Sequence, residues 1–90
     1  MLRLYVAGTS AASRQAERNF ERLLSLLGPD CQTEIVDVVT RPEMAERAGI
    51  LATPTLSFEH PLRPRRVIGD LSNPQKVIDF LGIPPKDGRT

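Results

Sequence analysis

The side chains that most often carry chemistry are few in this chain and lie far apart. The 90 residues include one cysteine, Cys31, and one histidine, His60. A lone cysteine cannot form a disulfide within the chain. A metal centre built on Cys and His needs several such ligands at suitable spacing, and the sequence has no further cysteine or histidine. We therefore expect no metal site, no cofactor and no catalytic residues.

Two short motifs remain as candidates for a functional site. The hydroxyl pair Ser10 and Ser13 stands where a helix is expected to begin, and Thr53-Pro54-Thr55 stands at the mouth of an apolar strand. Because Pro54 has no N–H to donate to a sheet, it is expected at the start of that strand and not in its middle. A bond before proline is also the one kind that adopts the cis form at low cost, about 0.5–1 kcal/mol.

Seven short elements must position these motifs. Apolar and β-branched runs at residues 2–7, 33–39, 55–58 and 65–69 predict strands. Apolar residues spaced three and four apart predict helices that follow the capping residues Thr9 or Ser10, Thr40 and Asn73 and end near the glycines at positions 28, 49 and 82. The predicted buried face of the third helix includes Phe80.

The order β-α-β-α-β-β-α predicts an α/β fold with a four-stranded mixed sheet. Right-handed crossovers predict that the first three strands run parallel, and a hairpin adds the fourth strand in the antiparallel direction. The expected strand order is 2-1-3-4, with helices on both faces. The length predicts one domain, over residues 1–83, followed by a disordered polar tail at 84–90.

The composition argues against several classes of partner. The net charge is +1 and aromatic residues make up 4% of the chain, so we expect no nucleic-acid binding. The apolar runs are much shorter than the roughly 20 residues of a membrane span. Residues 1–7 have neither the basic region nor the long apolar stretch of a signal peptide. We therefore expect a cytoplasmic protein that does not bind membranes.

The predicted layout resembles a thioredoxin fold that lacks its first strand. In that family a cis-proline in a Thr-Pro-Thr or similar context faces a Cys-x-x-Cys motif at the start of the first helix. The resemblance places Thr53-Pro54-Thr55 at the proline site, implies a cis bond before Pro54, and puts Ser10 and Ser13 at the cysteine positions. Disulfide exchange requires a thiolate, so the site resembles a redox motif without its redox atoms.

A second resemblance covers residues 2 to about 83 and is more specific. The chain is similar to the KaiB family of circadian clock proteins in the runs Leu4-Tyr5-Val6-Ala7-Gly8, Ile35-Val36-Asp37-Val38, Ile50-Leu51-Ala52-Thr53-Pro54-Thr55-Leu56 and Arg65-Arg66-Val67-Ile68-Gly69-Asp70-Leu71-Ser72-Asn73. It departs from the family pattern at Ala11, commonly proline, and at Pro74, commonly charged. It also lacks the acidic C-terminal extension of the cyanobacterial members, which favours a variant from another bacterium or a divergent paralogue.

The resemblance implies a protein without enzymatic activity. Such proteins bind the N-terminal ATPase ring of a KaiC-type ATPase, modulate its phosphorylation and ATPase cycle, and in cyanobacteria capture KaiA or sensor histidine kinases. The resemblance also implies two folds. One is a thioredoxin-like monomer, and the other is a dimer or tetramer with the order βαββααβ, formed by refolding of the second half of the chain.

Three surfaces are candidates for partner contact. The strand at 33–39 is expected at an open sheet edge, which can accept a partner's strand, and the resemblance assigns this edge to the KaiA-like or kinase partner. The candidate residues are Glu34, Val36 and Asp37 at this edge, Arg14, Arg18 and Arg22 on the first helix facing the KaiC-type ATPase, and Arg63, Arg65 and Arg66 as a second basic cluster. Each set also has a plainer interpretation, as solvated or edge-protecting charge.

A further group of residues is assigned to structure or to the fold switch. Gly69-Asp70 is either a simple turn or a hinge, since glycine tolerates positive φ. Asn73 and Pro74 suit the first turn of a helix and therefore favour the thioredoxin-like form. The structural assignments are completed by Ser10, Ser13, Thr53 and Pro54.

Two other functions stay open on the sequence alone. One is a stress-response adaptor whose partner is a kinase or a different ATPase. The other is a relic of a thioredoxin-like oxidoreductase, against which the serines at the cysteine positions argue.

Overall fold

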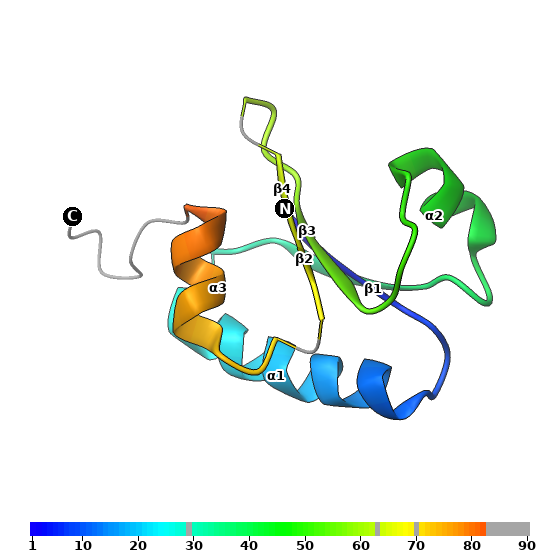
Figure 1. Cartoon of the computed structure of the whole chain (residues 1–90). Coiled ribbons are helices and arrows are strands. Elements are labelled where there is room, and N and C mark those ends of the chain that lie inside the picture. Colours follow the sequence, from blue (N-terminus) through cyan, green and yellow to red (C-terminus); the bar gives the residue numbers. More distant parts are fainter. Residues whose placement is uncertain (29, 63, 70, 83–90) are drawn as a thin grey trace.

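The computed structural model describes residues 1–28, 30–62, 64–69 and 71–82 (Figure 1). The strands are β1 (Leu2–Val6), β2 (Thr33–Asp37), β3 (Thr55–Phe58) and β4 (Arg65–Ile68), and the helices are α1 (Ala11–Leu27), α2 (Pro42–Ala48) and α3 (Pro74–Leu81). This order confirms the expected βαβαββα and differs from the alternative βαββααβ. Asp70 of the expected hinge, the tail at 84–90 and the domain boundary at residue 83 lie outside the described residues.

The four strands form one mixed sheet in the order β2-β1-β3-β4, as expected. β1 pairs in parallel with β2, which places Leu4 opposite Ile35. β1 pairs antiparallel with β3, and β3 pairs antiparallel with β4, so that Leu56 lies opposite both Leu4 and Val67. Two strands, β2 and β4, are therefore the edges of the sheet.

The prediction that the first three strands run parallel is wrong for β3. β2 ends at Asp37, opposite Val6, and β3 begins at Thr55, opposite Tyr5. Both positions are at the same end of β1, so the segment that contains α2 does not return along the sheet. α2 has seven residues, which span about 10 Å, whereas a five-residue strand spans about 17 Å. A helix this short does not make the crossover that a parallel β3 requires.

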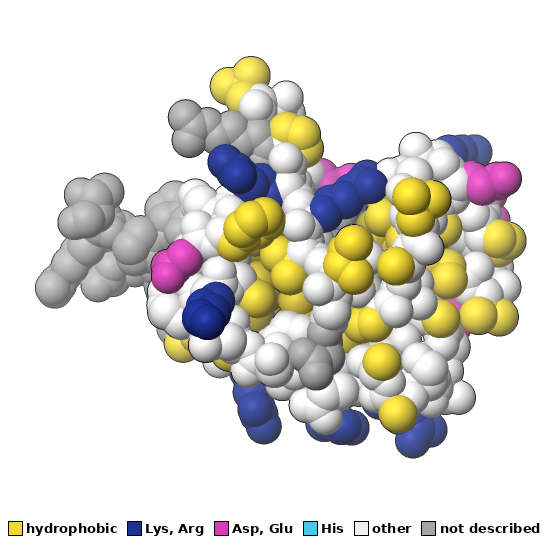
Figure 2. Space-filling model, in the orientation of Figure 1, with side chains coloured by type: hydrophobic (Ala, Val, Ile, Leu, Met, Phe, Trp, Pro, Cys, Tyr) yellow, Lys and Arg dark blue, Asp and Glu magenta, His cyan; other side chains and the backbone are white. Residues whose placement is uncertain are grey.

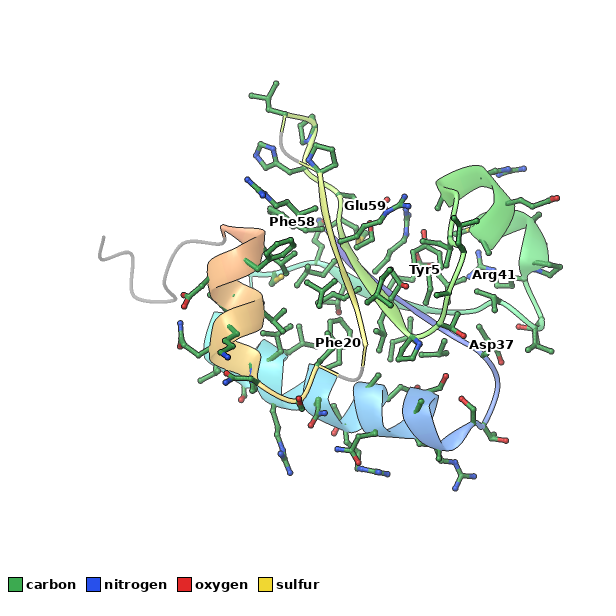
Figure 3. All side chains as sticks on the ribbon, in the orientation of Figure 1. Tyr5, Phe20, Asp37, Arg41, Phe58 and Glu59 are labelled. Carbon is green, nitrogen blue, oxygen red and sulfur yellow. The ribbon has the colours of Figure 1, made fainter. Side chains whose placement is uncertain are left out.

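The main core lies between the sheet and the pair α1 and α3. Its buried members are Leu2, Leu4, Val6, Ala16, Phe20, Leu23, Leu56, Leu71, Val77 and Leu81. Figure 3 shows Phe20 pointing from α1 toward the sheet. Each large apolar side chain buried in this way stabilises the fold by about 1.5–3 kcal/mol. This layer therefore holds α1 and α3 in place on one face.

The opposite face of the sheet carries α2 and is more polar. Arg3 and Tyr5 of β1 line a hollow there together with Met44 and Arg47 of α2. No residue of α2 is fully buried. Helices thus lie on both faces, as expected, and among the described residues the main apolar core lies on the face with α1 and α3.

Three local predictions are corrected by the structure. β2 stops at Asp37 instead of residue 39, because Val39 N–H donates to the Asp37 carboxylate in a turn. Thr40 does not cap α2, whose N-cap is Arg41 without a side-chain hydrogen bond. Phe80 is 55% exposed, because Val77 and Leu81, four residues apart, form the buried stripe of α3.

Candidate functional site

The serine pair at the start of α1 has a structural role. Ser10 Oγ accepts a hydrogen bond from Ser13 N–H at 3.2 Å and caps α1. Ser13 is fully buried, and its Oγ accepts a hydrogen bond from Ala7 N–H at 2.9 Å. The two hydroxyls therefore satisfy backbone donors at the junction of β1 and α1. The only thiol, on Cys31, has a pKa raised by burial, which lowers its thiolate fraction and its reactivity.

The proline motif lies at the same end of the sheet as this serine pair. The Thr53–Pro54 bond is cis, as the thioredoxin resemblance implied. Thr55 pairs with Tyr5 near the end of β1, and α1 follows β1 after a short loop. The buried Pro54 accepts a hydrogen bond from Gly69 N–H at 3.0 Å. Pro54 therefore connects the start of β3 to the residue that follows β4.

Glu34 on the β2 edge is neutralised within the chain. Its carboxylate lies 2.6 Å from Arg3 Nε and 3.5 Å from Arg41 Nη1. The hydrogen bond from Arg3 lowers the pKa of Glu34, and Arg41 adds to the effect. Arg3 also donates to Glu59 of the segment after β3. These four side chains form an ion-pair network across the sheet face under α2, so Glu34 presents little uncompensated charge to a partner.

Asp37 at the end of β2 holds two loops. Its Oδ1 accepts hydrogen bonds from Gly8 N–H at 3.0 Å and from Val39 N–H at 2.9 Å. Figure 3 places Asp37 close to Arg41, at the turn that leads to α2. This carboxylate is therefore occupied by backbone donors, like the Ser10 and Ser13 hydroxyls.

The third predicted edge residue, Val36, has a fully buried side chain. Its backbone N–H and C=O are directed toward β1, as for Gln32 and Val38, so neither the side chain nor the main chain of Val36 is presented to a partner. The exposed apolar side chain on β2 is instead Ile35, at 44% exposure. The edge itself is open within the described part of the chain, since β2 is the first strand of the sheet.

The basic row on α1 lies on the outside of the molecule. Arg14, Arg18 and Arg22 are all exposed and lie four residues apart, on one side of the helix. Figure 2 shows Lys and Arg side chains along α1, facing away from the sheet. Arg18 donates to Gln15 Oε1 at 2.7 Å. In the described ranges none of the three arginines forms an ion pair, so the row keeps its positive charge.

Of the predicted basic cluster, Arg63 lies outside the described residues, and Arg65 and Arg66 point apart instead of clustering. Consecutive strand residues point to opposite faces, and the guanidinium of Arg65 lies 5.8 Å from the ring centroid of Phe80 on α3. Arg66 reaches α2 and donates to the carbonyl oxygens of Ala48 and Gly49, the latter at 3.5 Å. Arg66 therefore connects β4 to the end of α2, and Arg65 covers the exposed side of α3.

The segment assigned to the fold switch has an unusual backbone. Gly69 has φ +130°, and Leu71 has φ +61° although its side chain is buried. A positive φ is uncommon for a bulky residue and carries strain. Asn73 Oδ1 accepts from Lys76 N–H at 3.2 Å, and Pro74 is the first residue of α3. The capping roles predicted for Asn73 and Pro74 are confirmed.

The described residues contain neither a metal-binding cluster nor a membrane-spanning helix. They contain no group of three or more His, Cys, Asp and Glu side chains arranged to hold a metal ion. No helix among them has the length and apolar character to cross a membrane.

The family follows from comparison with known proteins. A model of the KaiB domain matches residues 3–83. The chain belongs to the KaiB family. It is 42% identical over 87 residues to circadian clock protein KaiB3 of Synechocystis sp., covering 96% of this chain and 85% of that protein. It is 40% identical over 84 residues to circadian clock oscillator protein KaiB of Synechococcus elongatus, covering 92% of this chain and 82% of that protein.

Solved structures confirm the thioredoxin-like fold. Mitochondrial thioredoxin 3 from Saccharomyces cerevisiae, in its oxidised form, matches with a TM-score of 0.72 at 18% identity, covering 90% of this chain and 74% of that one. The germline thioredoxin Deadhead from Drosophila melanogaster matches with a TM-score of 0.71 at 17% identity, covering 90% and 76%. At such identities the likeness concerns the fold alone. This KaiB-family chain has that fold, with Ser10 and Ser13 at the positions of the Cys-x-x-Cys motif.

Two features of the site were missed by the sequence reasoning. Arg3 is the centre of the ion-pair network, and the signal was its position as the one charged residue in the apolar run of β1. An apolar hollow between β4 and α3 was also missed, because Phe80 was assigned to the core.

Proposed function

We propose that this KaiB-family protein has no enzymatic activity and acts by binding the N-terminal ring of a KaiC-type ATPase, thereby modulating the ATPase and phosphorylation cycle. The match of the KaiB domain over residues 3–83 is the observation that carries the proposal. The curated relatives at 40–42% identity are named as circadian clock proteins. We place the protein in the cytoplasm, as a monomer in the thioredoxin-like form.

The basic row of α1 is the surface that we assign to the ATPase. Arg14, Arg18 and Arg22 point to solvent and form no ion pair in the part of the chain that the structure describes. An uncompensated row of like charges attracts a surface of opposite sign and raises the association rate. The other charged surfaces are less suitable, since Glu34 is neutralised and Asp37 accepts backbone hydrogen bonds.

The chemistry of the redox-like site supports a binding function over an oxidoreductase. Ser10 and Ser13 both accept backbone hydrogen bonds, and the only cysteine in the sequence is Cys31. A protein with one thiol of raised pKa cannot cycle between a dithiol and a disulfide. We expect no activity in an insulin-reduction assay.

We further propose that the second half of the chain refolds into a dimeric or tetrameric form, with Gly69 as part of the hinge. Support comes from the positive φ at Gly69 and Leu71 and from the short, exposed β4. Strain at such a connection reduces the free-energy gap between two arrangements of the same chain. Size-exclusion chromatography reports the oligomeric state, and amide chemical shifts of residues 76–81 distinguish helix from strand.

The decisive experiment measures binding to the KaiC-type ATPase encoded in the same genome. The purified full chain and the intact ATPase ring are combined with ATP, and complex formation is followed by size-exclusion chromatography and biolayer interferometry. We expect a stable complex whose affinity falls as salt is raised, because charges at the interface are screened. Absence of a complex across nucleotide states contradicts the proposal and favours the adaptor with another ATPase or kinase.

A matched pair of variants tests the assigned surface. Arg18→Glu lies in the α1 row, and Arg47→Glu lies on α2; both residues are exposed, and each change alters the net charge by the same amount. We expect Arg18→Glu to weaken binding about tenfold and Arg47→Glu to leave it unchanged within about twofold, because only the first charge faces the ATPase. Equal losses for the two variants would reject the α1 surface.

A second surface is proposed for a sensor kinase or KaiA-like protein. The β2 edge is open within the described residues and exposes Ile35. A partner strand can add to such an edge through backbone hydrogen bonds to Ile35, since Val36, like Val38, directs its N–H and C=O toward β1. Ile35→Asp is expected to abolish this second contact without affecting the ATPase complex.

A further inference from the structure

The edge strand β4 has backbone groups that face away from the sheet. Gly69 N–H donates inward to Pro54, and residues alternate in the direction of their backbone polar groups along an antiparallel strand. Val67, paired with Leu56 of β3, therefore faces inward as well. The N–H and C=O groups of Arg66 and Ile68 point outward. β4 is the last strand of the sheet in the described part of the chain, so this edge can accept another strand.

An apolar hollow lies beside this edge, between β4 and α3. It has a volume of about 420 Å³ and is lined by Arg66, Val67, Ile68, Lys76, Val77 and Phe80. Phe80 is 55% exposed and Ile68 70% exposed. Figure 2 shows apolar side chains gathered between α3 and β4, with Lys and Arg side chains around them. A hollow of this kind is suited to one or two apolar side chains of a ligand.

The charges around the hollow are basic. Lys76 lines it and the guanidinium of Arg65 covers the ring of Phe80, whereas the guanidinium of Arg66 is directed to the end of α2. No carboxylate belongs to its described lining, and the nearby Asp79 carboxylate accepts a hydrogen bond from Gln75 at 3.0 Å. A second copy of the chain is an unsuitable occupant, because pairing of two β4 strands would bring four arginines together. The surface is instead complementary to an acidic segment.

We propose that β4 accepts an extended acidic and apolar segment of another protein, which adds a fifth strand to the sheet. The backbone of that segment bonds to Arg66 and Ile68, and one apolar side chain enters the hollow between Val67 and Phe80. In the bound segment, the residues two positions before and after the apolar residue lie on the same face of the strand. Acidic side chains at these two positions therefore contact Arg65 and Lys76. This site is separate from the α1 row and from the β2 edge, and it does not depend on binding to an ATPase.

The test uses a synthetic nine-residue peptide with a central isoleucine, glutamates two positions before and after it, and threonines between them. Binding to the ¹⁵N-labelled full chain is followed by NMR. We expect saturable binding with a Kd below about 1 mM. The largest shifts are expected at the amides of 66–68 and at 76–80. Shifts confined to 33–37, or no saturable binding, would overturn the proposal.

Two control peptides separate strand addition from simple charge attraction. Replacing both glutamates by lysine is expected to weaken binding at least tenfold, and N-methylation of the backbone next to isoleucine is expected to do the same. Equal binding of the N-methylated peptide would reject strand addition without any change to the protein. Equal binding of the lysine peptide would reject the acidic partner.

Variants of the chain locate the site. Phe80→Ala and Lys76→Glu are each expected to weaken peptide binding about fivefold or more, whereas Arg47→Glu and Ile35→Ala, at other exposed positions, are expected to leave it unchanged. Unaltered amide spectra away from the substituted residue establish that each variant is folded. If the free chain forms a dimer that Ile68→Asp dissociates, a second copy covers this edge and the proposal is wrong.

Discussion

The two edges of the sheet are built differently. At β2 the charged side chains are already engaged, since Glu34 pairs with Arg3 and Arg41 and Asp37 accepts two backbone hydrogen bonds. At β4, Arg65 and the neighbouring Lys76 of α3 lie beside an apolar hollow whose described lining has no carboxylate. The β2 edge thus offers a partner mainly its backbone and Ile35, whereas the β4 edge also offers charge and an apolar pocket.

The difference between the β2 and β4 edges shows that charged residues on an edge strand can have two roles. Charged residues can protect an edge against uncontrolled pairing, or they can hold neighbouring loops in place. At β2 the acidic residues organise the turn to α2 and the face beneath it. At β4 only Arg66 is engaged in this way, through the end of α2. The following predictions test this contrast, beginning with the largest expected effect.

Asp37→Ala is expected to lower the free energy of unfolding by about 2–3 kcal/mol, because it leaves the N–H groups of Gly8 and Val39 without their acceptor. Asp37→Asn keeps an oxygen acceptor and is expected to lose less than half as much. Urea denaturation followed by circular dichroism measures both. If the two variants are equally stable, Asp37 does not hold the loops and the contrast between the edges weakens.

Gly69→Ala tests the connection that follows β4. At the end of β2 the Asp37 side chain holds the chain in place, whereas after β4 the backbone conformation of Gly69 has this role. A Cβ at this position meets no neighbouring atom, but φ +130° is unfavourable for alanine. We expect a loss of about 1–2 kcal/mol for the thioredoxin-like arrangement, seen in NMR spectra as a larger population of a second set of amide signals. Spectra identical to those of the parent would reject the hinge role of Gly69.

Arg66→Ala and Arg65→Ala compare two neighbouring arginines of β4. Arg66 bonds to the end of α2, so its removal is expected to destabilise the protein by about 1 kcal/mol. Arg65 contacts only the exposed ring of Phe80 among the described residues, and its removal is expected to cost about 0.5 kcal/mol or less. Thermal unfolding of the two variants in parallel checks the ranking, and the reverse order would contradict it.

Glu34→Gln tests the ion-pair network at β2 through its pH dependence. The pKa of Glu34 is lowered from its ordinary value of 4.5 by Arg3, so its contribution to stability is complete above that pH and is lost as the pH falls through the lowered pKa. The stability difference between parent and Glu34→Gln is therefore expected at pH 7 and should disappear in strong acid. A difference that persists unchanged at pH 2 would show that the ion pair is not its origin.

Much of the fold was predictable from local patterns. Short β-branched runs, glycine stops and the Asn73-Pro74 start of α3 identified all seven elements, because strand and helix signals act over a few residues. The strand order also followed, together with the cis bond before Pro54. The direction of β3 was not predictable in this way. It depends on whether the segment that contains α2 crosses back over the sheet, and local sequence patterns do not indicate this.

The site was less predictable than the fold. The sequence motifs around Pro54 and Gly69 indicate the KaiB family. The interaction partners of the residues on the β2 edge cannot be read from the sequence. Arg3 lies 31 residues before Glu34, yet the parallel pairing of β1 and β2 places them opposite each other. Val36 is predicted as a partner residue but is buried in the folded sheet, where it lies opposite Tyr5 of β1.

By itself, the sequence determined the class of fold, the family, and the absence of a dithiol, because these depend on residue types and their local spacing. Only the tertiary structure decided which charges remain available. Ion pairs and carboxylate–backbone hydrogen bonds form between segments far apart in the chain. They engage the acidic residues of β2, whereas the basic residues of α1 and β4 remain exposed. The apolar hollow at β4 has the same origin, because Phe80 became a surface residue only once Val77 and Leu81 had taken the places facing the core.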